Sequence, residues 1–224
     1  MGQYYRIITR NTVGTVVYNR SVDGEYTLAK LMEHSWFRNP FCCALAEKLV
    51  DNPTRVCWVG DYAEPKECED LGFTYESVWG TDAYDPAVTI HGTTFQLSSK
   101  RYLINKTKNK AVDLKEYAKK NSDDGWVINP IPILTCLGNG RGGGDFHAAE
   151  NSGTTESYIG AWAMDEIYIS DTLPEGCKMI HPIFRERPHH VIGQPKFIGQ
   201  PKSVSDSPTR IIRTKEYTIS FGIR

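Results

Sequence analysis

One short stretch constrains the fold of this chain more than any other: five glycines fall within the seven positions 138–144, directly after the apolar run 131–137. Glycine loses more conformational freedom on folding than any other residue, so such a cluster indicates positive φ angles or a close backbone approach. A bulged hairpin or a compact loop that needs glycines for its shape alone has the same composition. The stretch therefore marks a place in the structure without specifying an activity.

The spacing Gly138-x-Gly140-x-x-Gly143 formally matches the dinucleotide-binding fingerprint. Its context does not, because only residues 145–150 can be helical before the next loop, and the strand–helix–strand alternation is missing. The stretch is not a phosphate-binding P-loop either, since no Gly-Lys-Ser/Thr follows the glycines.

A more general anion site is compatible with this stretch. Successive glycine N–H groups can form a concave nest for an anion, and an arginine within the run adds a planar fork for a phosphate or carboxylate. We therefore expect a nucleotide or phosphate ligand to be held by Gly138, Gly140, Arg141, Gly142, Gly143, Gly144 and Asp145. A base could stack on one of the aromatic residues Trp36, Trp58, Tyr62, Trp79 and Trp162, although most tryptophans in a domain of this size belong to the core.

Acid–base or metal chemistry has few candidates. Asp145 and His147 follow the glycines, and His181 is a further candidate, but single histidines more often act as ordinary hydrogen-bonding residues. Residues 33–35 read Glu-His-Ser, yet a catalytic triad is defined in space, and sequence neighbours seldom face each other. Enzymatic activity therefore stays open, no cofactor is identified, and no metal site is predicted.

Composition limits the class of protein. The 224 residues are 40% hydrophobic and 24% charged, which suits one domain with a sizeable core, with or without an appendage. Lys plus Arg (26) nearly balance Asp plus Glu (27), so the overall charge gives no signal for nucleic acid. The first residues do not resemble a secretory signal, and no run reaches the roughly 18 apolar residues of a membrane helix, so we expect a cytoplasmic protein. Its six cysteines form no Cys-x-x-Cys pair, and we expect reduced thiols.

Short runs of period two outnumber helical ones. This predicts an α+β fold, with a mostly antiparallel β-sheet and a few short helices packed on it. The clearest helix spans residues 39–50, because Asn39 is a typical N-cap, Pro40 suits the first turn, and Phe41, Leu45 and Leu49 recur four apart. We expect this helix on one face of the sheet and Trp58 in the core. Further short helices are expected after Thr27 and at 113–120, irregular structure at 63–92, and strands at 4–9, 13–18, 55–59, 101–105, 111–113, 126–128, 131–137, within 158–170 and at 178–184.

The character of the chain changes after residue 187. Residues 188–208 contain the tandem near-repeat Ile-Gly-Gln-Pro-Lys and several serines, which predicts an extended linker or arm. Residues 209–224 alternate well enough to form a terminal strand. The whole segment 188–224 carries six Lys and Arg against two Asp and Glu, so it is basic. We expect one domain over 1–187, followed by this arm.

Several longer blocks resemble one protein family: residues 1–5 (MGQYY), 28–36 (LAKLMEHSW), 58–63 (WVGDYA), 103–108 (LINKTK), 137–145 (LGNGRGGGD) and 160–167 (GAWAMDEI). This is a family of small uncharacterised proteins of bacteria, their phages and some microbial eukaryotes, and the likeness covers about residues 1–185. It implies shared descent and no particular activity. Members tend to have histidine at the position of Lys106 and tyrosine at that of Phe146, which weakens any mechanism relying on those side chains here. The phage association suggests action on a host nucleotide or signalling molecule.

Two functions from different classes follow. In the first, the glycine-rich loop and Arg141 bind a nucleotide or another phosphate-bearing small molecule, with or without hydrolysis. In the second, the protein is a non-enzymatic phage or host interaction protein, and the segment 188–224 binds a partner protein or a second copy of the chain. No membrane partner is expected in either.

Overall fold

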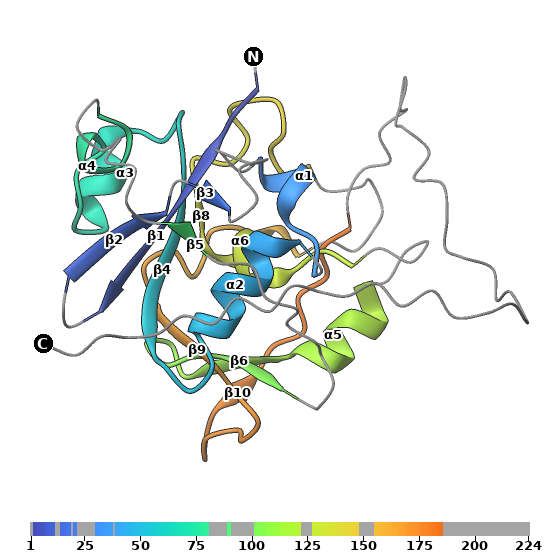
Figure 1. Cartoon of the computed structure of the whole chain (residues 1–224). Coiled ribbons are helices and arrows are strands. Elements are labelled where there is room, and N and C mark those ends of the chain that lie inside the picture. Colours follow the sequence, from blue (N-terminus) through green and yellow to red (C-terminus); the bar gives the residue numbers. More distant parts are fainter. Residues whose placement is uncertain are drawn as a thin grey trace, which may run out of the picture. The chain divides into compact units, whose positions relative to one another are not determined.

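The computed structural model describes residues 2–11, 14–18, 20–21, 30–37, 39–80, 89–90, 101–121, 127–147 and 155–185 (Figure 1). These residues all belong to one compact unit, Met1–Pro188. The predicted arm 188–208 and terminal strand 209–224 lie outside the described residues, and their role in binding a partner stays a prediction. No helix in the described part of the chain is long and apolar enough to cross a membrane.

A mixed β-sheet forms the centre of the domain, and the predicted α+β class is confirmed. Its strands are β1 (Tyr5–Asn11), β2 (Gly14–Tyr18), β4 (Thr54–Gly60), β6 (Tyr102–Asn105), β7 (Lys110–Asp113), β9 (Glu166–Ser170) and β10 (Lys178–Met179), in the order β10-β7-β6-β9-β4-β1-β2, and β8 (Cys136–Leu137) pairs with β4 beside this path. The long ladders β1–β2, β1–β4, β6–β7 and β6–β9 are antiparallel, whereas β7–β10 and β4–β8 are short parallel pairs. β3 (Arg20–Ser21) and β5 (Thr89–Ile90) form a separate two-stranded pair.

The predicted hairpins and the predicted helix are confirmed. β1 pairs with β2, and β6 pairs with β7 across the turn at residues 106–109. α2 (Pro40–Lys48) begins where expected, because the Asn39 side chain accepts a hydrogen bond from the Phe41 N–H at 2.9 Å. Asp113 likewise caps α5 (Leu114–Asn121) through the N–H groups of Lys115 and Glu116.

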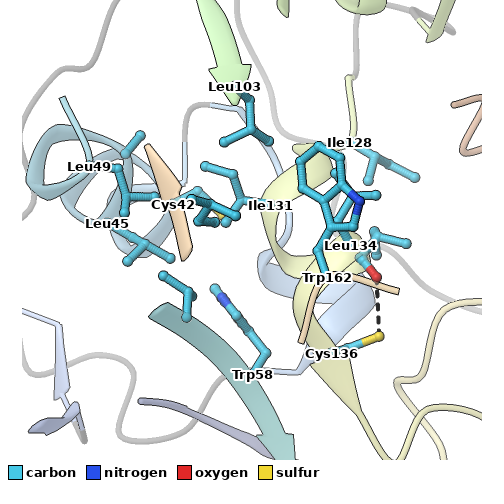
Figure 2. Packing of buried hydrophobic residues seen from close by; sticks show 14 of the residues in the cluster. Cys42, Leu45, Leu49, Trp58, Leu103, Ile128, Ile131, Leu134, Cys136 and Trp162 are labelled. Carbon is cyan, nitrogen blue, oxygen red and sulfur yellow. Dashed lines mark hydrogen bonds between the residues drawn. The ribbon is translucent and has the colours of Figure 1, made fainter. Parts of the chain in front are cut away.

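The strands β1 and β4 are buried on both faces, because their side chains alternate between two clusters. Ile7 and Trp58 point into the larger core, which also contains Leu45 and Leu49 of α2. Figure 2 shows these leucines on one side of Trp58 and the buried Trp162 on the other. Trp58 is 0% exposed, which confirms its place in the core.

The opposite face of β1 and β4 is covered by two helices that the sequence did not predict. Residues 63–92 were expected to be irregular, but α3 (Pro65–Asp70) and α4 (Glu76–Trp79) form there. Cys68 of α3 and Val78 of α4 pack against Ile8 of β1. The apolar and aromatic residues of this stretch keep no regular helical period in the sequence, although Pro65 at the first turn is a typical helix start.

The apolar run 131–137 was predicted to be a strand, and this was wrong for most of its length. α6 (Pro130–Thr135) occupies it, and only β8 is extended. The Asn129 side chain accepts from the Ile131 N–H at 3.0 Å, and Pro130 stands at the first turn. These two start signals outweigh the β-propensity of the isoleucines. The remaining described helices are α1 (Leu31–His34) and the 3₁₀ turn Glu156–Tyr158.

Candidate functional site

The glycine-rich loop lies at one end of the central strands because of how β1, β4 and β8 pair. β1 runs antiparallel to β4 and matches Tyr5 with Gly60, while β8 runs parallel to β4 and matches Leu137 with Val59. β8 therefore ends where β1 begins, and the loop that follows it lies beside the first residues of the chain.

Three segments that are distant in the sequence meet at this loop. Gly2 forms a β-bridge with Gly143, and the Met32 N–H donates to the Gly144 carbonyl at 3.0 Å. On another side, Arg141 donates to the Tyr62 carbonyl at 2.9 Å. Residues 2–5, 30–36, 58–63 and 137–145 are thus brought together.

The amide groups of the loop converge on one oxygen, and that oxygen belongs to the chain itself. Asp145 Oδ2 accepts from the N–H groups of Gly140 at 2.7 Å, Arg141 at 2.8 Å and Gly142 at 2.8 Å. The Asp145 side chain is 0% exposed. These three amides form a concave nest, and the buried Asp145 carboxylate fills it, while binding of an external anion by the loop stays a prediction.

The second oxygen of Asp145 is bound by Tyr5. The Tyr5 hydroxyl donates to Asp145 Oδ1 at 2.6 Å. Burial, and next the hydrogen bond to Asp145, raise the pKa of Tyr5, so the phenol stays protonated and remains a donor. Three backbone amides and one phenol thus satisfy the buried carboxylate, and among the described residues no cationic side chain donates to it.

Two of the glycines show why this loop needs them. Gly140 has φ 94°, a conformation that side chains other than glycine rarely adopt. At Gly142, an added Cβ would lie 2.6 Å from the Cβ of Gln3 and 3.0 Å from the Tyr62 ring. Both the turn and the close packing on the first residues of the chain require glycine.

The Arg141 guanidinium is held by Glu67 of α3. Its Nη1 and Nη2 atoms donate to Glu67 Oε2 at 2.7 Å and Oε1 at 2.6 Å, and both side chains are 35% exposed. The hydrogen bond from Arg141 is the main cause that lowers the pKa of Glu67. Glu67 Oε2 also accepts from the Glu64 N–H at 2.9 Å, so the carboxylate is anchored to the start of α3.

The histidine candidates are not gathered at the loop. His147 and His181 are exposed, and the four groups that donate to Asp145 include neither. His34 is buried, and its Nδ1 accepts from the Lys30 N–H at 2.8 Å. Glu33 is exposed and paired with Lys30 at 2.8 Å. Among the described residues, no group of three or more His, Cys, Asp or Glu side chains is placed to hold a metal ion.

The five aromatic candidates for stacking differ in how deeply they are buried. Trp58 and Trp162 are core residues, and Trp79 lies under the Arg6 guanidinium at 4.4 Å from its ring centroid. Trp36 is partly buried against the larger core. Tyr62 is the one of the five whose ring lies against the glycine-rich loop, at Gly142.

Sequence reasoning missed Tyr5, Gln3 and Glu67 as parts of the site. Gln3 Nε2 donates to the Gly138 carbonyl at 3.0 Å, and its buried Oε1 has no hydrogen-bond partner in the described part of the chain. The Tyr5 and Glu67 contacts join residues 140 and 74 positions apart, so no local spacing announces them. The acidic residue directly after the glycines was the available signal, since a short carboxylate there can reach back to the preceding amides.

No protein-family model, curated protein or solved structure matches the chain.

Proposed function

We propose that the protein binds a phosphate-bearing small molecule, such as a nucleotide, on the outer face of the glycine-rich loop, with Arg141 as its charged contact. The observation that carries this proposal is that the loop binds its buried carboxylate without using the arginine side chain. Backbone amides satisfy the buried Asp145 carboxylate, so the positive charge of Arg141 is not consumed there and is presented at the surface.

In this proposal the glycines shape the loop and their amides do not touch the ligand. A ligand phosphate could reach the amides of Gly140, Arg141 and Gly142 only by expelling the Asp145 carboxylate, which has four donors and no exposed surface. Hydrogen bonds to a charged group contribute about 1.5 to 3 kcal/mol each. The half-exposed pair of Arg141 and Glu67 contributes only about 0 to 1 kcal/mol. Binding at Arg141 therefore costs far less free energy in lost contacts than binding at the amides of the nest.

Tyr62 is the aromatic residue best placed to accompany Arg141. Its carbonyl accepts from Arg141, and its ring lies against Gly142. Stacking of a base on an aromatic side chain contributes about 1 to 3 kcal/mol. A nucleotide whose phosphate lies at Arg141 and whose base lies at Tyr62 would use both contacts.

The proposal is tested by titrating the protein with inorganic phosphate, AMP and ATP while following binding by calorimetry. We expect Arg141→Ala to weaken binding by about 1 to 3 kcal/mol, from the loss of charge-assisted hydrogen bonds. Lys66→Ala is the matched control, because it removes an equal charge from α3, where Lys66 pairs with Asp70. Equal affinities of the wild type and Arg141→Ala, or no binding of any probe, would refute the proposal.

A further inference from the structure

We infer that Glu67 is a positioning residue, which fixes the Arg141 guanidinium so that its Nε/Nη2 edge binds two oxygens of a terminal phosphate group. This inference rests on the proposed function, since it says how the same residue meets its ligand. It assigns Glu67 a supporting role and not that of a competitor for the arginine.

The donor count of the guanidinium leads to this conclusion. An arginine has five N–H donors: two on Nη1, two on Nη2 and one on Nε. Nη1 uses both of its hydrogens, on Glu67 Oε2 and the Tyr62 carbonyl, and Nη2 uses one, on Glu67 Oε1. Within the described part of the chain, the second Nη2–H and the Nε–H have no acceptor.

These two remaining donors lie on the same edge of the guanidinium. Glu67 occupies the end of the group, between Nη1 and Nη2, and the Tyr62 carbonyl lies on the Nη1 side. The opposite edge, formed by Nε and Nη2, is a second fork with parallel N–H groups. Such a fork matches two oxygens of a phosphate or a carboxylate.

Glu67 is itself held in place, which makes it suitable as a support. It belongs to α3, and its Oε2 also accepts from the Glu64 N–H. A free arginine side chain must give up its rotamers when a ligand binds, whereas a side chain already fixed at three hydrogen bonds has lost most of them before binding. The negative charge of Glu67 opposes an anion, but this repulsion is screened by salt, while the geometric effect is not.

The direct test is the Nε–H resonance of Arg141 in the wild-type protein, assigned by its loss in Arg141→Lys. We expect this resonance to shift as inorganic phosphate or AMP is added, because the Nε–H becomes a donor to the ligand. Acetate at equal concentration distinguishes a carboxylate from a phosphate, and we expect the smaller shift from acetate. Binding of phosphate with an unmoved Nε–H would overturn the inference, and so would an equal or larger shift from acetate.

The supporting role is tested by Glu67→Gln, with binding of AMP measured at about 0.1 M and about 1 M NaCl, where the Debye length falls from about 10 Å to about 3 Å. At the higher salt, we expect Glu67→Gln to bind AMP about 2- to 10-fold more weakly than the wild type does. This is the effect of ordering one long side chain on binding. Glu116→Gln is the matched control, since Glu116 lies in the first turn of α5 and pairs with Lys119 at 2.9 Å.

The outcomes separate the two proposals. If Arg141→Ala abolishes binding while Glu67→Gln binds AMP as well as or better than the wild type at high salt, Glu67 competes with the ligand and the inference is wrong. If Arg141→Ala binds as the wild type does, the proposed function itself fails. Should Glu67→Gln not fold, the wild-type resonance still decides.

Discussion

Two buried aspartates hold two loops of this domain, and they are satisfied in opposite ways. Asp165 is 7% exposed, and its Oδ2 accepts from Lys108 Nζ at 2.5 Å and from Asn105 Nδ2 at 2.7 Å. Asp145 is 0% exposed and accepts from three backbone amides and a phenol. Asp165 forms an ion pair with a lysine, whereas the described donors to Asp145 are all uncharged groups.

The difference explains what the glycines achieve. In the turn at 106–109, Lys108 joins Asp165 and also donates to the Ala161 carbonyl at 2.7 Å, so its charge is used within the domain. In the glycine-rich loop, oriented amide dipoles take the place of a cation. Arg141 therefore remains at the surface, where Glu67 and Tyr62 hold it.

Replacing the two aspartates should give the largest effects and the clearest contrast. We expect Asp145→Ala to lower the free energy of unfolding by about 3 to 5 kcal/mol, because the amides and the Tyr5 hydroxyl lose their shared acceptor. Asp165→Ala should lower it by about 1 to 2 kcal/mol, since Lys108 is 42% exposed and turns to water. Urea unfolding measures the loss for both variants. Equal losses would contradict the expectation that Asp145 matters more to stability than Asp165.

Tyr5→Phe tests the side-chain part of the Asp145 arrangement. One hydrogen bond to a buried carboxylate is removed while the ring stays, so we expect a loss of about 1.5 to 3 kcal/mol. The neighbouring Tyr4 is 36% exposed, and Tyr4→Phe should change the free energy of unfolding by less than about 0.5 kcal/mol. Similar values for the two variants would show that the phenol of Tyr5 contributes little.

The sequence predicted elements with strong local signals and missed contacts that only the fold creates. The helix after Asn39 was found because cap, proline and apolar spacing agree, whereas the run 131–137 was misread because its apolar residues outweighed the start signals at Asn129 and Pro130. The anion nest was expected at the glycines, but the sequence did not show that Asp145 fills it. That outcome depends on Tyr5 arriving from β1, and no pattern near residue 145 encodes it.

The two cations should differ in their effect on stability. Of the described side chains, Lys108→Ala leaves only Asn105 as a donor to the buried Asp165, and we expect a loss of about 1 to 2 kcal/mol. Arg141→Ala removes a half-exposed pair, and we expect a loss of at most about 1 kcal/mol. Thermal or urea unfolding of both variants checks this order, and a larger loss for Arg141→Ala would mean that it mainly supports the fold.

The smallest effect expected is a pH dependence confined to the glycine-rich loop and its neighbours. Burial is the main cause that lowers the pKa of His34 below its ordinary value of 6.5. The unfolded chain then binds a proton more readily than the folded one, so stability is complete above about pH 6.5 and falls as the pH drops toward the lowered pKa.

The loss of stability at low pH should first affect the contact between α1 and the glycine-rich loop. This contact is the hydrogen bond from the Met32 N–H to Gly144. We expect the hydrogen-exchange protection of the Met32 amide, corrected for intrinsic rates, to fall between pH 7 and pH 5.5. The Lys106 amide, which donates to the Glu166 carbonyl near Asp165, should keep its protection better. His34→Gln should flatten the Met32 profile, while His181→Gln, at an exposed position, should leave it unchanged. If Met32 and Lys106 lose protection together, the two loops open as one unit and not independently.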